Sequence, residues 1–438
     1  MRDFIAENFK FQPYWWEAAP PLPHQHPTIE PQYDVAIIGS GFTGASAAIP
    51  LARAGLSVAM FDKDDPGAGA SRRAAGFMGR VLKKSYGDLV HSKGEKKARA
   101  TYLELNANFE FTLDLIAKEG IDCFADRPGR FIGATSPGHY SALEADLTLL
   151  RQALGYEFRM VPRAHQHDEM ATDAYWGGAV IPDNGCLHPG LYHKGLLDRA
   201  IDAGAHVFGQ TEVIKLIDLG DKGHKLQTNR GTLRARQVII ATNGYTPKSL
   251  NWYSRRLIPF RAFMAATEEL PEDLMTKLIP NRRTIIDSNA NIDFFRPAPD
   301  SRRIIFGGAT TEKLDGPEAI AKRMKQILGR ILPDAQDVRL SHVWDGYCAA
   351  TFDMMPHLGS RGTIHHAVGY NFAGITTGTV FGRLLAQRIL GQASNGSVFE
   401  NGSFPTIPFY SGTPWFLGLV MRYFAWHDQQ IARKAANS

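Results

Sequence analysis

Apolar residues between 33 and 63 form two short continuous runs separated by a stretch of helical composition. YDVAIIG (33–39) and SVAMFDK (57–63) are apolar over a strand's length, which is typical of parallel strands buried on both faces. ASAAIPLARAG (45–55) lies between them and favours a helix. Together the segments predict one βαβ unit of about 30 residues.

Predicted helices and strands continue to alternate further along the chain. Helices are predicted over 95–120, 140–160 and 316–330, and GLLDRAIDAGAHVF (195–208) predicts a helix, a glycine stop and a strand. Strands are predicted for 211–218, 225–235, 236–245 and much of 256–310, with a hairpin turn from Pro297 to Ser301. A strand, a glycine-rich turn and a long helix are predicted over 362–390.

The turn between the first strand and helix, GSGFTG, matches the dinucleotide fingerprint at Gly39, Gly41 and Gly44. The first glycine permits a tight turn, the second lets the backbone approach a pyrophosphate, and the third allows close helix–strand packing. The helix N-terminus would direct free N–H groups at the phosphates. Asp62, 18 residues after Gly44, can accept both ribose hydroxyls and would repel a 2′-phosphate. These features predict an ADP-like ligand.

Three further segments favour FAD over NAD. GAGASRRAAGFMG (67–79) has small residues that let backbone lie along a long cofactor, and Arg72 or Arg73 can neutralise phosphate. VIIATNGY (238–245) is a buried strand ending in a glycine turn. GYNFAGITTG (369–378) places a helix N-terminus where its dipole could stabilise a reduced flavin.

The residues expected to hold FAD come from these segments and from one strand start. They are Gly39, Ser40, Gly41, Phe42, Thr43, Gly44, Asp62, Lys63, Gly69, Ala70, Ser71, Arg72, Arg73, Ala75, Gly76, Phe77, Met78, Val213, Ala241, Thr242, Asn243, Gly244, Tyr245, Gly369, Asn371, Phe372, Gly374, Ile375 and Thr376.

These segments, in this order, resemble the FAD-dependent oxidoreductases of the D-amino acid oxidase superfamily, and within it the γ-glutamylputrescine oxidase-like branch. The shared features are an N-terminal Tyr-Trp arm (14–16), a GAS-x-R-x-x-G loop (69–76), an A-T-N-G-Y strand end (241–245), a T-x-D-x-x-P-x-x-G segment (351–359) and the Gly-Tyr-Asn turn (369–371). The resemblance covers about 12–395. It implies that an amine carbon gives a hydride to flavin N5, that the imine hydrolyses, and that O2 reoxidises the flavin with formation of H2O2.

The chain also departs from this family. The branch has Gly-Arg-Asn-Gly-Gly after GAS, whereas this chain has Arg-Arg-Ala-Ala-Gly at 72–76, which puts the familiar substrate in doubt. The Arg-Pro that helps glycine oxidase-like enzymes hold a carboxylate is absent before Thr351, so a simple α-amino acid is disfavoured. Gly346 stands where sarcosine oxidase-like enzymes carry a flavin-linked cysteine, and Cys348 is out of register. Non-covalent FAD is therefore expected.

The expected fold is α/β (α+β overall), a Rossmann-like FAD-binding domain interleaved with an antiparallel-sheet substrate domain, of the glutathione reductase type. The boundaries expected are an N-terminal arm (1–30), a discontinuous FAD-binding domain (31–110, 190–250 and 335–395), a substrate domain (111–189 and 251–334) and a C-terminal extension (396–438).

Four residues are candidates for contact with the reacting amine: Arg261, Arg296, Trp344 and Tyr347. Arg261 could bind an anionic group or assist O2, or form a structural ion pair. Arg296 could point into the substrate cavity or brace a strand. Trp344 could stack over substrate and Tyr347 could form a wall, although aromatic residues on strands usually belong to a core. Asp345 could pair with a cationic amine or serve a structural role.

Composition sets the wider limits. The chain has 438 residues, 44% hydrophobic and 21% charged, with a net charge of +5, which fits a two-domain globular protein without a nucleic-acid footprint. Three scattered cysteines give neither a metal spacing nor a disulfide framework, so no metal and a cytoplasmic location are expected. No apolar run reaches about 18 residues, so no spanning helix is expected. The aromatic segment 414–430 predicts an amphipathic helix packed on the body, or one that contacts a membrane surface.

Three functions remain open from the sequence. The first is an FAD-dependent amine or amino acid oxidase whose partners are a small amine and O2. The second is an FAD-dependent dehydrogenase that passes electrons to a quinone or another carrier. The third is a flavin-binding protein without turnover. A homo-oligomer is compatible with each of them.

Overall fold

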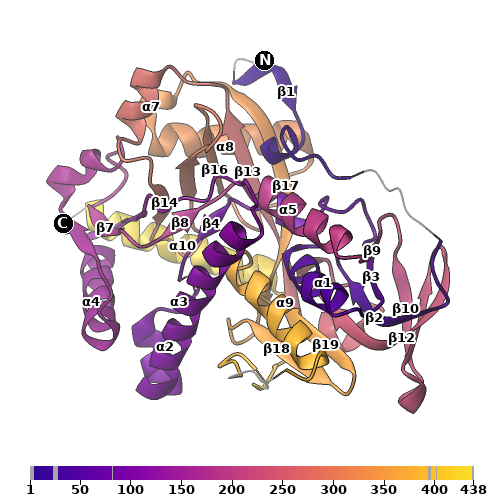
Figure 1. The fold of residues 1–438 in the computed structure, drawn as a ribbon. Helices are drawn as coiled ribbons and strands as arrows, with labels where there is room; N and C mark the ends of the chain where they lie inside the picture. The colour runs from indigo at the N-terminus through magenta and orange to yellow at the C-terminus, as the bar shows by residue number, and fades with distance from the viewer. Residues whose placement is uncertain (1–3, 23–27, 81, 393–395, 401, 437–438) are drawn as a thin grey trace.

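The computed structural model describes residues 4–22, 28–80, 82–392, 396–400 and 402–436. Two large sheets organise these residues (Figure 1). Each sheet carries its own helices, and the chain passes several times between them.

The smaller of these sheets contains the predicted βαβ unit. β2 (Gln32–Ile38) pairs in parallel with β3 (Val58–Phe61) and with β12 (Gly231–Ile240). α1 (Phe42–Arg53) connects β2 to β3. The sheet order is β10-β11-β12-β2-β3-β9, and β19 joins it beside β12. The remaining strands are β9 (His206–Phe208), β10 (Val213–Asp218), β11 (His224–Thr228), β18 (His357–Arg361) and β19 (Ile364–Val368).

Helices cover one face of this sheet and bury its main core. α1 packs against α5 (Pro189–Asp202) and α9 (Thr376–Ile389), and α9 in turn contacts α3 (Glu95–Lys118). Alternate residues of β2 show why both faces are apolar. Val35 and Ile37 lie in the core beneath α1, whereas Ala36 and Ile38 lie in a second core with residues of β11 and β12. A strand buried on both faces explains the continuous apolar run in the sequence.

The larger sheet has nine strands in the order β1-β17-β13-β16-β15-β14-β5-β7-β6. Its long central strands β13 (Leu257–Thr267) and β17 (Leu340–Thr351) are antiparallel. The others are β1 (Ile5–Lys10), β5 (Arg130–Gly133), β6 (Arg159–Val161), β7 (Gly178–Ile181), β14 (Thr284–Asp287), β15 (Phe294–Pro297) and β16 (Ile304–Gly308). α8 (Gly316–Ile331) packs on it. The other helices are α2 (Tyr86–Lys93), α4 (Pro137–Leu154), α6 (Asn251–Ser254) and α7 (Glu272–Leu278), and β4 (Phe77–Met78) pairs with β8 (Gly185–Cys186).

Two strands of this sheet were expected elsewhere from the sequence. β17 was expected in the FAD-binding part that begins at 335, but it pairs along its length with β13 in the larger sheet. β1 lies in the segment read as an arm, yet it forms the edge strand beside β17. Both pairings join residues that are far apart in the sequence, and local periodicity does not report such partners.

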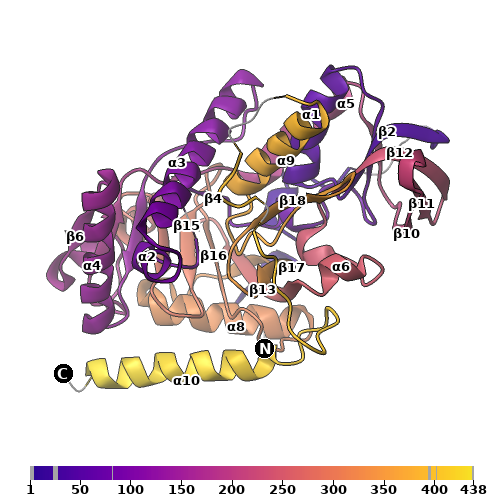
Figure 2. The ribbon, with the colours of Figure 1, turned by 90° about the horizontal axis from the view of Figure 1, so that it is seen from below.

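The predicted C-terminal helix is present as α10 (Leu417–Ala436), which lies as a separate rod along one edge of the molecule, at the bottom of the view in Figure 2. It was expected either to pack on the body or to contact a membrane surface, and several of its large apolar side chains are exposed, including Leu419, Tyr423 and Trp426. Asp428 anchors it by accepting a hydrogen bond from the Ala290 N–H at 3.3 Å. Over the described part of the chain, no helix meets the length and apolarity that a membrane crossing requires.

Candidate functional site

The glycine turn between β2 and α1 has the geometry that its three glycines predict. Gly39 has φ +103°, and a side chain there would lie 2.6 Å from the Ala241 carbonyl oxygen. A Cβ on Gly44 would lie 2.1 Å from the Gly39 carbonyl oxygen, so the helix can approach the turn only without one. Gly41 is the residue before α1. The turn therefore leaves the helix N-terminus open beside the backbone, as an anion site requires.

Asp62 follows β3 and is tied to this turn. Its Oδ2 accepts hydrogen bonds from the Ser40 N–H at 3.1 Å and the Ser40 hydroxyl at 2.6 Å. Burial raises the pKa of the Asp62 carboxyl, and the bonds from Ser40 oppose that rise. The carboxylate is thus held beside the glycine turn by a neighbour that favours its charged form.

The loop after Asp62 brings a hydroxyl to the start of α1. Ser71, in the short 3₁₀ helix Ala70–Arg72, accepts a hydrogen bond from the Phe42 N–H at 3.0 Å. The two arginines that follow are placed differently. Arg73 donates to the Ala68 carbonyl at 2.6 Å and to the Asp345 carbonyl at 2.8 Å, and its guanidinium lies 4.8 Å from the Trp16 ring.

Arg72, one of the two arginines expected to neutralise phosphate, is fully buried in this structure. Its Nη1 donates to the Ala19 carbonyl at 3.1 Å, and its Nε donates to His193 Nδ1 at 2.9 Å. Burial lowers the pKa of His193 to about 3, so the ring is neutral. Because Nδ1 accepts from Arg72, Nε2 carries the proton and donates to the Ser40 carbonyl at 2.7 Å. Arg72 therefore links the N-terminal arm to the back of the glycine turn.

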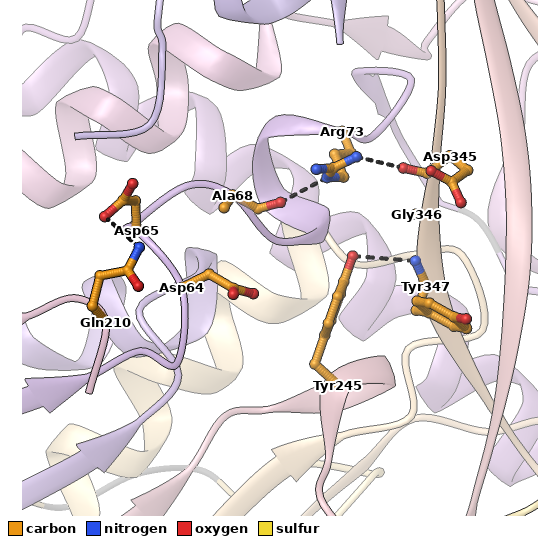
Figure 3. Close-up of a pocket in the computed structure, with 9 residues that line it drawn as sticks. All are labelled: Asp64, Asp65, Ala68, Arg73, Gln210, Tyr245, Asp345, Gly346 and Tyr347. Atoms are coloured by element: carbon orange, nitrogen blue, oxygen red, sulfur yellow. Dashed lines mark hydrogen bonds between the residues drawn. The ribbon is translucent and has the colours of Figure 1, made fainter. Parts of the chain in front are cut away.

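A cavity of about 420 Å³ opens beside Arg73 (Figure 3). It brings together three residues predicted separately, Arg73, Tyr245 and Tyr347. The Tyr347 N–H donates to the Tyr245 hydroxyl oxygen at 3.2 Å, and the two rings meet edge to face at 5.8 Å. The complete lining is Asp64, Asp65, Ala68, Arg73, Gln210, Tyr245, Asp345, Gly346 and Tyr347.

Two segments predicted to hold FAD, the strand end 241–245 and the turn 369–376, are cross-braced. The Gly369 N–H donates to Asn243 Oδ1 at 2.9 Å, and the Thr351 N–H donates to Asn371 Oδ1 at 3.1 Å. Asn243, Asn371 and Phe372 have positive φ values of 41°, 47° and 78°. Strained backbone of this kind concentrates at functional sites. The Asn243 side chain therefore joins the two segments, and the Asn371 side chain joins the turn to the end of β17.

The start of α9 lies against the start of α1. The Thr43 and Tyr370 hydroxyls are 2.5 Å apart, and a Cβ on Gly382 of α9 would lie 2.3 Å from the Thr43 carbonyl oxygen. In the first turn of α9, the Thr377 hydroxyl is buried and has no hydrogen-bond partner among the described residues. Two adjacent helix N-termini without side-chain caps, a glycine-rich turn and an unpartnered buried hydroxyl fit a long anionic dinucleotide such as FAD.

The four candidates for contact with the amine fall into two groups. Tyr347 lines the cavity and is 44% exposed. Arg261 forms an ion pair with Asp345, whose carboxylate also lies at the cavity, and donates to the Leu314 carbonyl at 3.0 Å.

Arg296 and Trp344 are each 1% exposed, and neither is among the lining residues. Both donate to backbone carbonyls instead. The Trp344 indole N–H donates to the Arg73 carbonyl at 3.0 Å, and Arg296 Nη1 donates to the Leu187 carbonyl at 2.8 Å. The structure therefore agrees with the structural alternatives given for these two residues, a bracing arginine and a core aromatic, rather than with contact to substrate.

Several lining residues were missed by the sequence. Asp64 and Asp65 lie two and three residues after Asp62, which was the available signal. The Gln210 amide donates to Asp65 at 3.1 Å. The lining includes three carboxyl-bearing residues, Asp64, Asp65 and Asp345, and one arginine, Arg73, so acidic groups outnumber basic ones.

The fold and this site define a dinucleotide-dependent oxidoreductase with its cofactor segments drawn from the whole length of the chain. The family model for the FAD dependent oxidoreductases (DAO) matches residues 34–388, and the chain belongs to this family. It is accordingly an FAD-dependent enzyme.

Individual relatives agree with this assignment. The chain is 26% identical over 380 residues to the probable oxidoreductase OrdL of Haemophilus influenzae, covering 85% of this chain and 86% of that protein. It is 27% identical over 381 residues to the γ-glutamylputrescine oxidoreductase of Escherichia coli, covering 86% and 88%. The crystal structure of glycine oxidase from Geobacillus kaustophilus superposes with a TM-score of 0.71 at 23% identity, over 86% of this chain and 99% of that one, which confirms the predicted fold.

Proposed function

We propose that this enzyme oxidises the C–N bond of an amine or an N-substituted amino acid, using non-covalent FAD and O2. The observation that carries the proposal is that the loop at 67–79 and the strand end 241–245 meet β17 at one cavity with more acidic than basic groups in its lining, in a chain whose residues 34–388 match the family model. When bound, FAD supplies the hydride acceptor and the route to O2. Hydrolysis of the imine by water and formation of H2O2 complete the reaction.

The predicted FAD residues divide by segment. The turn at Gly39, Gly41 and Gly44, with Ser71 beside the start of α1, would take the pyrophosphate. Asp62 would accept the ribose hydroxyls. The strand end 241–245 and the turn 369–376 would enclose the flavin half. Burial raises the pKa of Cys348 to about 12, so its thiol is protonated at neutral pH and is a poor nucleophile for a covalent link.

The cavity lining favours a cationic substrate. Asp64, Asp65 and Asp345 raise the local concentration of an amine that enters with its positive charge. Asp345 is held in place by Arg261, and Tyr347 gives the amine chain an apolar wall. A γ-glutamylated diamine, the substrate type in the name of the Escherichia coli relative, presents such a charge. Its carboxylate, on the glutamyl group, is remote from the charged end of the diamine, whereas in glycine the carboxylate is on the carbon that carries the amine.

An anaerobic screen of the FAD-loaded protein tests the proposal. The panel contains γ-glutamylputrescine, free diamines, glycine, sarcosine and iminodiacetate, and loss of the visible flavin band reports reduction. We expect bleaching by a cationic amine, then recovery in air with one H2O2 per turnover.

Other outcomes would overturn the proposal or part of it. Protein that cannot be loaded with FAD would refute it outright. Bleaching followed by slow recovery in air but rapid recovery with a quinone would make the enzyme a dehydrogenase. Failure of the whole panel would favour a flavin-binding protein without turnover.

A further inference from the structure

Four successive carbonyl groups of the loop at 73–76 are held by buried side chains. The Trp344 indole N–H donates to the Arg73 carbonyl at 3.0 Å, and the Trp15 indole N–H donates to the Ala74 carbonyl at 2.8 Å. Arg296 Nη1 donates to the Ala75 and Gly76 carbonyls at 3.3 and 3.2 Å. These three side chains, which we call the carbonyl clamp, come from three elements distant in the sequence.

Each clamp residue is fixed by its own surroundings. Trp15 is fully buried, and Trp344 and Arg296 are each 1% exposed. Arg296 also donates to the Leu187 carbonyl at 2.8 Å and lies 5.8 Å from the Trp15 ring. Trp15 meets the His188 ring edge to face at 4.7 Å. The clamp is therefore a rigid wall behind the loop.

Gly76 is what allows the clamp to close. Its φ is +79°, and a Cβ there would lie 2.3 Å from the Leu187 carbonyl oxygen and 2.6 Å from Arg296 Nη1. No side chain fits that space. The glycine of the family loop is kept at this position, while Arg72, Arg73, Ala74 and Ala75 fill the preceding positions.

Pinning the carbonyls also directs the N–H groups of the same peptide units. In a trans peptide the C=O and the following N–H point in opposite directions. The N–H groups of Ala75 and Gly76 therefore point away from Trp15 and Arg296. Within the described part of the chain, neither N–H donates to a protein acceptor. Two adjacent free donors are thus held in a fixed orientation beside the cofactor segments.

We propose that Trp15 and Arg296 are positioning residues that fix the N–H groups of Ala75 and Gly76 as a donor pair for bound FAD. Trp344 supports them by holding the preceding peptide unit, between Arg73 and Ala74. The inference rests on the proposed binding of FAD at this loop. Fixed donors stabilise negative charge, so the clamp strengthens FAD binding and raises the reduction potential of the flavin, whose reduced form is anionic. The N-terminal arm thereby acts on the flavin without touching it.

Two substitutions test the clamp by removing one indole N–H each while keeping an aromatic ring. Trp15→Phe should weaken FAD binding about tenfold, the size expected for loss of one hydrogen bond at a buried group. Trp344→Phe, which acts on the neighbouring peptide unit, should weaken it by a smaller factor. Both variants should also shift the flavin reduction potential to more negative values and change the shape of the visible flavin band. Fluorescence titration of apoprotein with FAD and dye-equilibrated reduction measure these quantities.

Trp252→Phe is the matched control, because the Trp252 ring packs against Arg256 and His366 away from the loop and its indole N–H has no hydrogen bond among the described contacts. It should leave FAD affinity and potential unchanged. Thermal unfolding of each apoprotein separates positioning from stability.

The proposal is refuted if both clamp variants match Trp252→Phe, or if they lose only apoprotein stability while the folded fraction keeps wild-type affinity and potential. Should Trp344→Phe not fold, Trp15→Phe alone decides, since its indole belongs to the arm. Wild-type protein that binds no FAD would refute the proposed function instead, so the two failures are distinguishable.

Discussion

At Gly44, α1 packs so closely on the turn before it that a methyl group has no room. Its Cβ would lie 2.1 Å from the Gly39 carbonyl oxygen and 3.2 Å from the Ile37 side chain. Backbone atoms cannot move aside as a flexible side chain would. We expect Gly44→Ala to lower the free energy of unfolding by about 3 kcal/mol, the upper end for overpacking, and to abolish FAD binding. Urea unfolding of the apoprotein and FAD titration measure the two effects.

Gly329→Ala provides the comparison, because Gly329 lies within α8 and nothing lies within 4 Å of an added Cβ. Alanine there should stabilise the protein by up to about 1 kcal/mol through helix propensity and leave FAD affinity unchanged. If the two variants had the same free energy of unfolding, the prediction that a Cβ at Gly44 destabilises the fold would be contradicted.

The roles of single residues could be predicted from the sequence where the backbone geometry demands a particular residue type. The directions in which side chains point could not be predicted. The glycine spacing gave the turn, because each glycine answers a local requirement of the backbone. Arg296 and Trp344 were placed near the reacting amine, yet both turn behind the loop at 73–76. Their direction depends on the register of β15 and β17 within the larger sheet, and that register is set by strands distant in the sequence.

At the scale of elements, the β14–β15 hairpin holds two buried carboxyls close together. Asp287 and Asp293 are 2% and 6% exposed. Burial, and then the charge of Asp293, raises the pKa of Asp287 above its ordinary value of 3.8. Burial also raises the pKa of Asp293, against the opposing charge of Arg330. The folded state therefore binds protons at this hairpin more tightly than the unfolded state does.

This difference predicts the sign of a pH effect. The contribution of Asp287 to stability is fully present below pH 3.8 and is lost as the pH rises through the raised folded pKa. Asp287→Asn should flatten the fall in unfolding free energy with rising pH, because an amide does not titrate. Asp221→Asn, on an exposed turn, should keep the wild-type slope. Urea unfolding across a pH series would contradict the prediction if the Asp287→Asn slope were as steep as the wild type's.

Helices and strands whose conformation is determined by their own residues were predicted well. Strands whose conformation depends on pairing with residues distant in the sequence were not. α1, α3, α5, α8 and α9 lie close to their predicted ranges, because each has its own apolar periodicity and stop signals. The strand β1 was read as part of an arm, and β17 was assigned to the wrong sheet. An edge strand of mixed polarity gains its conformation from its partner, so its own residues carry little signal.

At the scale of the whole molecule, α10 is a nearly independent appendage. Leu419, Tyr423 and Trp426 are 64%, 58% and 55% exposed, and its clearest polar contact is between Asp428 and the backbone of 290–291. Truncation after Phe416 should change the free energy of unfolding by less than about 1 kcal/mol, because a surface contact of this kind contributes little. Urea unfolding and FAD content measure the effect. A large loss of either would show that α10 is integral to the fold.

The two sheets are expected to unfold together, because the chain does not divide into separable halves. β12 of the smaller sheet leads directly to β13 of the larger, and β17 of the larger leads back to β18. The cavity likewise takes residues from both, with Asp64 and Tyr245 beside Asp345 and Tyr347. Calorimetry of the apoprotein should therefore show one transition. FAD at about 100 times its Kd should raise the stability of that single transition by about 2.7 kcal/mol. If FAD instead moved one of two separate transitions, the cofactor would be held by the smaller sheet alone.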